Sequence, residues 1–248
     1  MRKRKYNKLK CLKIGVILIM VCVSLLAKMD TKEERVRFTQ INRSERIQRE
    51  VYLEVPQICQ YPALPTGCES VAATMVLQYY GDDIEAETFA SVWLTCDSDF
   101  YVENGITYGP DPNKVFAGNP FSKNSYGCFA PVIEKAINDN SSACQAQMIE
   151  GEKLKKLCDT YVSRGNPVLV WVTMSMKESY QGNRWTLSDG TEYTWLAGEH
   201  CMVLVGYDER HYYLNDPMSG GTVGYDKAIV EKRYEEMGMQ AVYISLKN

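Results

Sequence analysis

TGCESVAATMVLQYYG, residues 66–81, is the stretch that decides the fold most directly. Its apolar residues recur at the spacing of one helix face, at Val71, Met75, Val76 and Tyr79. Thr66 with Glu69 three residues later predicts a capping box, and Gly81 is a typical residue just past a helix end. We therefore expect a helix that carries Cys68 in its first turn.

Other elements follow from pattern along the chain. Helices are expected over 85–94, 131–138 and 151–164, and strands over 51–56, 168–173, 200–208, 211–217 and 240–246, with a hairpin that turns at Asp189-Gly190. The stretch 95–130 is rich in Gly, Pro, Asn and Asp and is expected to be a long irregular insert. Helices first and sheet second predict an α+β fold, in which the helix of Cys68 packs on a C-terminal antiparallel sheet.

The N-terminus has the composition of a targeting segment. Seven Lys and Arg and no acid precede the 14 uncharged residues 14–27, IGVILIMVCVSLLA. This pattern predicts a signal peptide over residues 1–27, or an uncleaved signal anchor, because Leu25 is a poor residue for a cleavage site. Residues 28–50 are expected to form a charged stalk, and residues 51–248 one domain outside the cytoplasm, membrane-anchored or secreted.

Charge and cysteine content narrow the function classes. Residues 28–248 keep 21 Lys and Arg against 31 Asp and Glu, a net charge of −10, which argues against nucleic acid as a partner and restricts membrane contact to the N-terminal segment. Seven of the nine cysteines lie beyond the targeting segment. Export would permit up to three disulfides, with one thiol left over. The chain has no Cys-x-x-Cys pair, so neither a structural zinc site nor a cofactor is expected.

Cys68 is the candidate nucleophile. The first turn of a helix has unpaired N–H groups and the positive end of the helix dipole, which favour a thiolate. The adjacent Gly67 would leave room for a substrate backbone. A buried structural cysteine, or one half of a disulfide, is the alternative interpretation.

His200 is the candidate base, because a thiolate mechanism needs a proton partner and the chain holds only two histidines. His200 opens a buried strand about 130 residues after the cysteine, the order of papain-type enzymes. By alternation Cys201 points to the opposite face, whereas His211 lies beside a turn and is expected at the surface. Asp216 ends the next strand and is the candidate that orients the imidazole, with Asn215 as the alternative.

A developing oxyanion needs hydrogen-bond donors. The backbone N–H of Cys68 is one, and a glutamine a few residues upstream is the usual second. Gln60 lies eight residues before Cys68 and is preferred, while Gln57, eleven residues before, is a competitor.

Three stretches carry a family resemblance: VPQICQYPALPTGCESVAATMVLQYYG (55–81), DPNKVFAGNPFSKNSYGCFAPVI (111–133) and GEHCMVLVGYDERHYYLNDP (198–217). Over roughly residues 51–245 the chain resembles stand-alone relatives of the bacteriocin-processing, double-glycine-type endopeptidases, cysteine peptidase family thirty-nine. The resemblance implies a papain-like fold, with Cys68, His200 and Asp216 at the catalytic positions and Gln60 at the oxyanion position. Transporter-linked members trim leader peptides in the cytoplasm, a role that we do not carry over to a chain with an export segment.

The predicted function is a peptidase that cleaves peptide or protein substrates through an acyl-enzyme. A cell-wall amidase, transglutaminase or acyltransferase would use the same triad, because water or an amine can resolve the acyl-enzyme. A peptide-binding module without catalysis is an alternative from another class. A thiol-reactive acyl probe distinguishes this module from the enzymes.

Overall fold

The computed structural model describes residues 50–247. The expected signal segment 1–27 and nearly all of the stalk 28–50 lie outside these residues. Within the described part of the chain, no helix is both long and apolar enough to cross a membrane.

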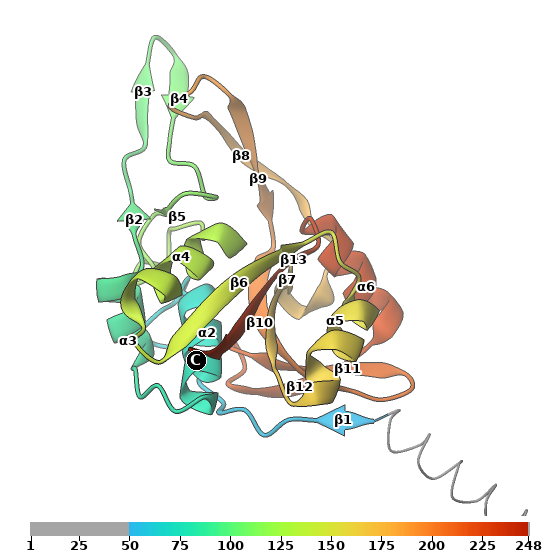
Figure 1. Cartoon of the computed structure of the whole chain (residues 1–248). Coiled ribbons are helices and arrows are strands. Elements are labelled where there is room, and N and C mark those ends of the chain that lie inside the picture. The colour runs from blue at the N-terminus through green and yellow to red at the C-terminus, as the bar shows by residue number, and fades with distance from the viewer. Residues whose placement is uncertain (1–49, 248) are drawn as a thin grey trace, which may run out of the picture. The chain divides into compact units, whose positions relative to one another are not determined.

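An antiparallel sheet forms the centre of the domain (Figure 1). Its strands lie in the order β12-β11-β10-β7-β13-β6, and β1 pairs with the end of β10 on the edge opposite β11. The bounds are β1 Val51–Tyr52, β6 Cys144–Glu150, β7 Val168–Thr173, β10 Glu199–Tyr207, β11 His211–Asp216, β12 Gly221–Asp226 and β13 Gln240–Leu246. The C-terminal antiparallel sheet expected from the sequence is thus confirmed.

Helices cover both faces of this sheet. Helices α2 (Cys68–Tyr79) and α4 (Ala130–Asn140) contribute to one apolar cluster, and α5 (Leu154–Thr160) and α6 (Lys227–Glu236) to the other. Strand β10 is buried along its whole length because its alternate residues enter the two clusters. This two-sided burial explains why the central strands have continuous apolar sequences.

The helix predictions hold with changes at the ends. The stretch 85–94 forms α3 (Ala86–Thr88), which continues as a π-helix over Phe89–Trp93. The stretch 151–164 forms α5 and a 3-10 turn over Val162–Arg164, and a second 3-10 turn spans Met174–Met176. Strand β6 and helix α6 had no counterpart among the predicted elements.

The insert is more regular than expected, so the prediction of an irregular 95–130 stretch was wrong in part. Strands β3 (Tyr101–Glu103) and β4 (Ile106–Tyr108) form a hairpin, which joins β8 (Tyr180–Thr186) and β9 (Glu192–Ala197) in a second, four-stranded sheet. Strands β2 (Cys96–Asp97) and β5 (Phe116–Ala117) pair in parallel. The hairpin turns at Asn104-Gly105, both at positive φ, as a tight two-residue turn requires.

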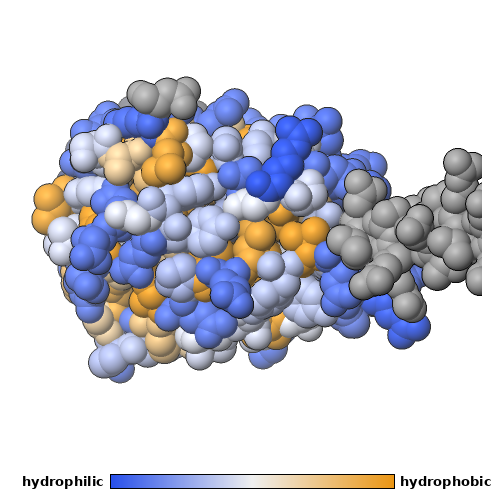
Figure 2. Space-filling view, turned by 60° about the horizontal axis from the view of Figure 1, so that its bottom comes forward, coloured by the Kyte–Doolittle hydropathy of each residue, from blue (hydrophilic) through white to orange (hydrophobic). Residues whose placement is uncertain are grey.

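Hydrophobic residues on the face in Figure 2 lie in separate patches among hydrophilic ones. The large apolar side chains that are exposed within the described residues include Tyr101 and Val102 on β3 and Tyr180 on β8. The second sheet therefore carries part of the exposed apolar surface of the described residues.

Candidate active site

Cys68 is the first residue of α2, as the sequence predicts, and is 6% exposed. The expected capping box does not form. Gly67 is the N-cap residue, and the hydroxyl of Thr66 donates to the carbonyl of Ser122, 2.9 Å away. The prediction was wrong because the side chains of Thr66 and Glu69 form hydrogen bonds with residues outside the helix instead of capping it.

Gly67 fits a crowded position between two loops. A Cβ at this residue would lie 3.0 Å from Cβ of Leu64 and 3.2 Å from Cβ of Pro120. Glycine therefore allows the chain before the candidate nucleophile to approach the insert closely, which adds a packing reason to the expected space for substrate.

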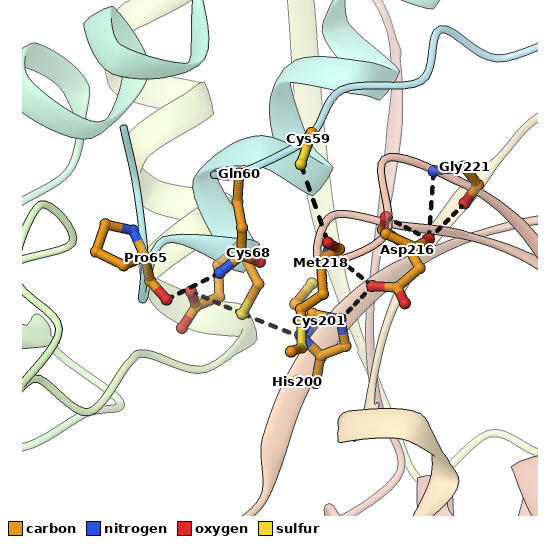
Figure 3. Close-up of polar contacts among 11 residues, drawn as sticks. Cys59, Gln60, Pro65, Cys68, His200, Cys201, Asp216, Met218 and Gly221 are labelled. Atoms are coloured by element: carbon orange, nitrogen blue, oxygen red, sulfur yellow. Dashed lines mark hydrogen bonds and ion pairs between the residues drawn. The ribbon is translucent and has the colours of Figure 1, made fainter. Parts of the chain in front are cut away.

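His200 and Asp216 meet at the end of the strand pair β10–β11. The distance between His200 Nε2 and Asp216 Oδ1 is 2.7 Å, and the side chains are 2% and 10% exposed. The register that pairs Val203 with Asn215 produces this neighbourhood (Figure 3). Because Asp216 contacts Nε2, the ring nitrogen of His200 that has no hydrogen bond within residues 50–247 is Nδ1.

Two interactions hold the carboxylate of Asp216. Burial by itself would raise its pKa, but the hydrogen bond and charge interaction with His200 lower it, as does the N–H of Met218, which donates to Oδ1 over 2.8 Å. The resulting pKa lies below the usual value, so Asp216 stays ionised at neutral pH.

Asn215, the alternative orienting residue, has another partner set. Its amide nitrogen donates to the carbonyl oxygens of Val55 and Pro56, and its oxygen accepts from the hydroxyl of Thr222. Asn215 thereby ties the first segment of the domain to β11, and no hydrogen bond joins it to His200 in the described part of the chain.

The sulfur of Cys68 lies against the start of β10. The N–H of Cys201 donates to Sγ over 3.5 Å, which places the sulfur beside the peptide that links His200 to Cys201 (Figure 3). The thiol itself donates to Oε2 of Glu69, 3.3 Å away. Cys201 and Cys68 belong to the same apolar cluster, so Cys201 packs beneath α2, whereas Met202 enters the cluster on the opposite face.

The expectation of a stabilised thiolate was wrong for this state of the protein. Burial raises the pKa of Cys68 well above its usual value, and the nearby charges of Glu69 and Glu199 raise it further. The hydrogen bond from Cys201 opposes this effect without reversing it. In this structure the candidate nucleophile is therefore a neutral thiol turned toward Glu69, and the described residues show no hydrogen bond between it and His200.

Glu69 and Glu199 are the two residues of the site that sequence reasoning missed. Both are buried, at 0% and 8% exposed. Burial raises the pKa of Glu69 to about 7, although its Oε1 accepts the N–H of Cys128 over 2.7 Å. Burial and then the charge of Glu69 raise the pKa of Glu199 well above its usual value. A signal existed, since each glutamate directly adjoins Cys68 or His200 in the sequence.

Gln60 is a buried residue, 4% exposed, in the otherwise largely exposed loop before α2. Its Nε2 donates to the carbonyl of Pro65 over 3.0 Å, which leaves a second N–H on that nitrogen, and its backbone N–H donates to Pro217, next to Asp216. Gln57 is exposed and donates to Thr222 instead. Of the two glutamines, Gln60 is thus the buried one, and it lies nearer in the chain to Cys68 (Figure 3).

The structure contains no disulfide among the cysteines of residues 50–247. All seven are free thiols: Cys59 and Cys96 are exposed, and Cys68, Cys128, Cys144, Cys158 and Cys201 are buried. The expected bridges are not confirmed. The number of cysteines and an oxidising compartment determine how many disulfides are permitted. They do not determine whether two sulfur atoms lie close enough to form a bond.

A cleft of about 700 Å³ lies between the insert and β8. Phe100, Tyr126 and Trp185 supply aromatic surface, and Asn119 and Asn183 supply polar groups. The loop that forms one wall includes residues 118–126, which bind residues 66 and 67 through the contacts described above. The wall of the cleft and the chain that leads into Cys68 are therefore one packed unit.

Comparisons with known proteins agree with this architecture. A crystal structure from Bacillus anthracis, named as a candidate C39-like peptidase, has a TM-score of 0.69 at 25% identity and covers 80% of this chain and 98% of its own. The peptidase domain of Streptococcus ComA, a bi-functional ABC transporter involved in a quorum sensing pathway, has a TM-score of 0.46 at 16% identity. This match covers 79% of this chain and 99% of that domain's chain. At that level the second match carries no argument.

In sequence, the chain is 30% identical over 195 residues to the uncharacterized protein YvpB of Bacillus subtilis. The matched region covers 74% of this chain and 70% of that protein. The model of the Peptidase_C39 like family matches residues 52–242. The resemblance read from the three sequence stretches is thereby confirmed, and with it the α+β fold of papain-like type. The chain belongs to the Peptidase_C39 like family.

Proposed function

We propose that this protein is a thiol hydrolase that cleaves peptide bonds, with Cys68 as nucleophile, His200 as base and Asp216 as the residue that orients the base. The observation that carries the proposal is the 2.7 Å contact of His200 with Asp216, beside a cysteine held at the first turn of α2. Family membership supports a peptide substrate.

The first step is a proton transfer from the Cys68 thiol to His200. This step requires the Cys68 side chain to rotate away from Glu69 until the sulfur reaches Nδ1, and Sγ already lies at the His200–Cys201 peptide. The ionised Asp216 would stabilise the imidazolium that forms and would hold the tautomer in which Nδ1 is the nitrogen free to accept the proton. A neutral resting thiol is compatible with this scheme, since the proton moves only as substrate arrives.

The thiolate then attacks the substrate carbonyl carbon and forms a C–S bond. The N–H of Cys68, unpaired at the helix start, and the second amide N–H of Gln60 are the proposed donors to the oxyanion. The imidazolium gives its proton to the leaving amine as the C–N bond breaks. A water molecule, deprotonated by His200, next hydrolyses the thioester and restores the thiol.

The aromatic cleft beside the site is the proposed place for substrate side chains. Phe100, Tyr126 and Trp185 offer apolar faces, while Asn119 and Asn183 offer amide donors and acceptors in the lining. A substrate that fills this cleft would run past residues 66 and 67 toward Cys68.

The decisive experiment is digestion of a peptide and muropeptide library, read by mass spectrometry. We expect cleavage by the wild-type chain and none by Cys68→Ala. Amine transfer without cleavage would favour an acyltransferase or transglutaminase, and release of cell-wall fragments an amidase. A wild-type chain that binds peptides but neither cleaves nor labels with an acyl probe would overturn the proposal.

We also propose that the domain works outside the cytoplasm, on the basis of the cationic cluster and the apolar run before residue 28. N-terminal sequencing of the protein from membrane and medium fractions distinguishes a retained anchor from a cleaved signal. An intact chain in the cytosol would contradict both.

A further inference from the structure

Three groups that can bind a divalent cation such as Zn²⁺, one thiol and two carboxyl groups, converge on one point at the start of α2. Sγ of Cys68, a carboxylate oxygen of Glu69 and a carboxylate oxygen of Glu199 all lie within 4.8 Å of one another. The Cys68 and Glu69 atoms come from adjacent residues, whereas Glu199 is brought in by β10 from 130 residues away in the sequence. All three residues are buried.

Glu199 provides an observation of its own. The residue is only 8% exposed, and its buried Oε1 has no hydrogen-bond partner among the described residues. Neither Glu199 nor Glu69 takes part in an ion pair within residues 50–247. An ionised carboxyl group that is buried without a donor or counter-charge is unfavourable, so a bound cation would supply the partner that the described residues do not give to Glu199.

The local packing accommodates both carboxyl groups. A Cβ on Gly127 would lie 2.5 Å from Oε1 of Glu69 and 3.0 Å from Oε2 of Glu199, so only glycine leaves room for the pair. The N–H of Cys128 holds Oε1 of Glu69 over 2.7 Å, which turns Oε2 toward the sulfur. A hydrogen bond to a ligand's second oxygen is the usual way in which proteins orient metal ligands.

The spacing fits a small tetrahedral ion. Zinc bonds to sulfur at about 2.3 Å and to carboxylate oxygen at about 2.0–2.2 Å, so two such ligands on a tetrahedron lie roughly 3.6 Å apart. The sulfur of Cys68 and Oε2 of Glu69 are 3.3 Å apart. Shifts of a few tenths of an ångström to about 1 Å in the side chains would therefore complete three ligands.

We propose that Cys68, Glu69 and Glu199 bind a thiophilic divalent cation of the Zn²⁺ class, and that the bound cation reversibly blocks the nucleophile. The thiolate ligand selects Zn²⁺ or Cd²⁺ over Mg²⁺ and Ca²⁺, which prefer oxygen ligands in larger number. On binding, the Cys68 thiol and any protonated carboxyl group among the ligands release their protons to solvent, and a sulfur lone pair and one oxygen lone pair of each carboxylate form the bonds to the metal. The blocking role rests on the proposed function, whereas the binding itself does not.

The first test uses the full-length wild-type chain and reads protection of single thiols. Iodoacetamide alkylation is followed by peptide mass spectrometry with and without micromolar Zn²⁺. We expect Zn²⁺ to slow alkylation of Cys68 at least about tenfold, while the exposed Cys59 reacts at an unchanged rate. Equal rates at Cys68 with and without Zn²⁺ up to millimolar concentration would overturn the proposal, and no variant needs to fold for this result.

The second test assigns the ligands by Cd²⁺ titration of the ultraviolet thiolate–metal band. Loss of an outer partner already costs about 10- to 100-fold in metal affinity, so Glu199→Gln is expected to weaken binding at least about tenfold. Glu192→Gln, at an exposed position on β9, is the matched control and should leave affinity unchanged. His200→Ala should also retain binding, because His200 is not among the converging groups.

Loss of binding in His200→Ala together with retention in Glu199→Gln would overturn the ligand assignment in favour of a Cys68–His200 site. Circular dichroism confirms that each variant is folded, and an unfolded Glu199→Gln returns the decision to the alkylation rates of the wild-type chain. If Cd²⁺ binds through Cys68 but no substrate is cleaved, the proposed hydrolase function fails while the cation site stands.

Discussion

Replacing Asp216 with Asn removes the charge from the partner of His200 and keeps an oxygen that can accept its hydrogen bond. The side chains of His200 and Asp216 are 2% and 10% exposed, so water and salt screen their interaction little. The amide should hold the ring in place through the 2.7 Å contact, while the imidazolium formed during catalysis loses its counter-charge.

The size of the effect follows from this burial. A hydrogen bond to a charged group contributes about 1.5–3 kcal/mol, against about 0–1 kcal/mol for an exposed ion pair. Each 1.36 kcal/mol in a barrier changes a rate tenfold. We therefore expect Asp216→Asn to lower kcat/KM by about 10- to 150-fold, mainly through kcat, because the lost interaction strengthens in the transition state.

The assay measures kcat and KM on a peptide selected from the library digestion. The chain provides a matched control, since a second histidine–aspartate pair joins His211 Nδ1 to Asp208 Oδ2 over 3.1 Å, with side chains 41% and 25% exposed. Asp208→Asn should change kcat/KM by less than about twofold. If Asp216→Asn retained more than about one third of wild-type activity, or if the control lost as much, Asp216 would not be the orienting residue.

Three further predictions concern the other site residues. Cys68→Ala should lower hydrolysis by at least about 10³-fold with an unchanged circular dichroism spectrum, and residual activity of a few per cent would exclude Cys68 as nucleophile. His200→Ala should lower hydrolysis as severely, whereas His211→Ala should leave it nearly unchanged in the same assay. A larger loss in His211→Ala than in His200→Ala would exclude His200 as the base. Gln60→Ala should lower kcat by about 10²- to 10³-fold through loss of an oxyanion donor, whereas Gln57→Ala should leave it within about twofold; similar losses in both would reject Gln60 as a specific donor.

Periodic and local signals predicted the central elements well. The apolar spacing of α2 and the continuous apolar run of β7 are set by burial against the sheet, which a single sequence records directly. The Asn104-Gly105 turn was also visible in the sequence, but the Gly- and Pro-rich composition around it favoured an irregular loop.

Contacts in the site were predicted where the residues are close in sequence or lie on paired strands. Contacts between residues that are distant in sequence and not on paired strands were missed. Asp216 follows from the register of two adjacent strands. Glu69 was interpreted as a helix cap because its position suits one, yet its partners Cys128 and Glu199 come from distant segments. No periodicity reports such a long-range contact, nor the burial that keeps the Cys68 thiol neutral.

The distance along the chain between the parts of the site has a consequence for the timing of folding. The contact between Cys68 and Cys201 spans 133 residues, and the bond from Asn215 to Val55 spans 160. Contacts of such high sequence separation form late, because their loop-closure entropy must first be offset by other structure. At about 5–20 residues per second, a ribosome would release the segment with Cys68 roughly 7–27 s before the segment with Cys201. A nascent chain would therefore carry the proposed nucleophile without the proposed base for more than half of its synthesis, and the proposed hydrolysis could begin only once His200 and Asp216 had been translated.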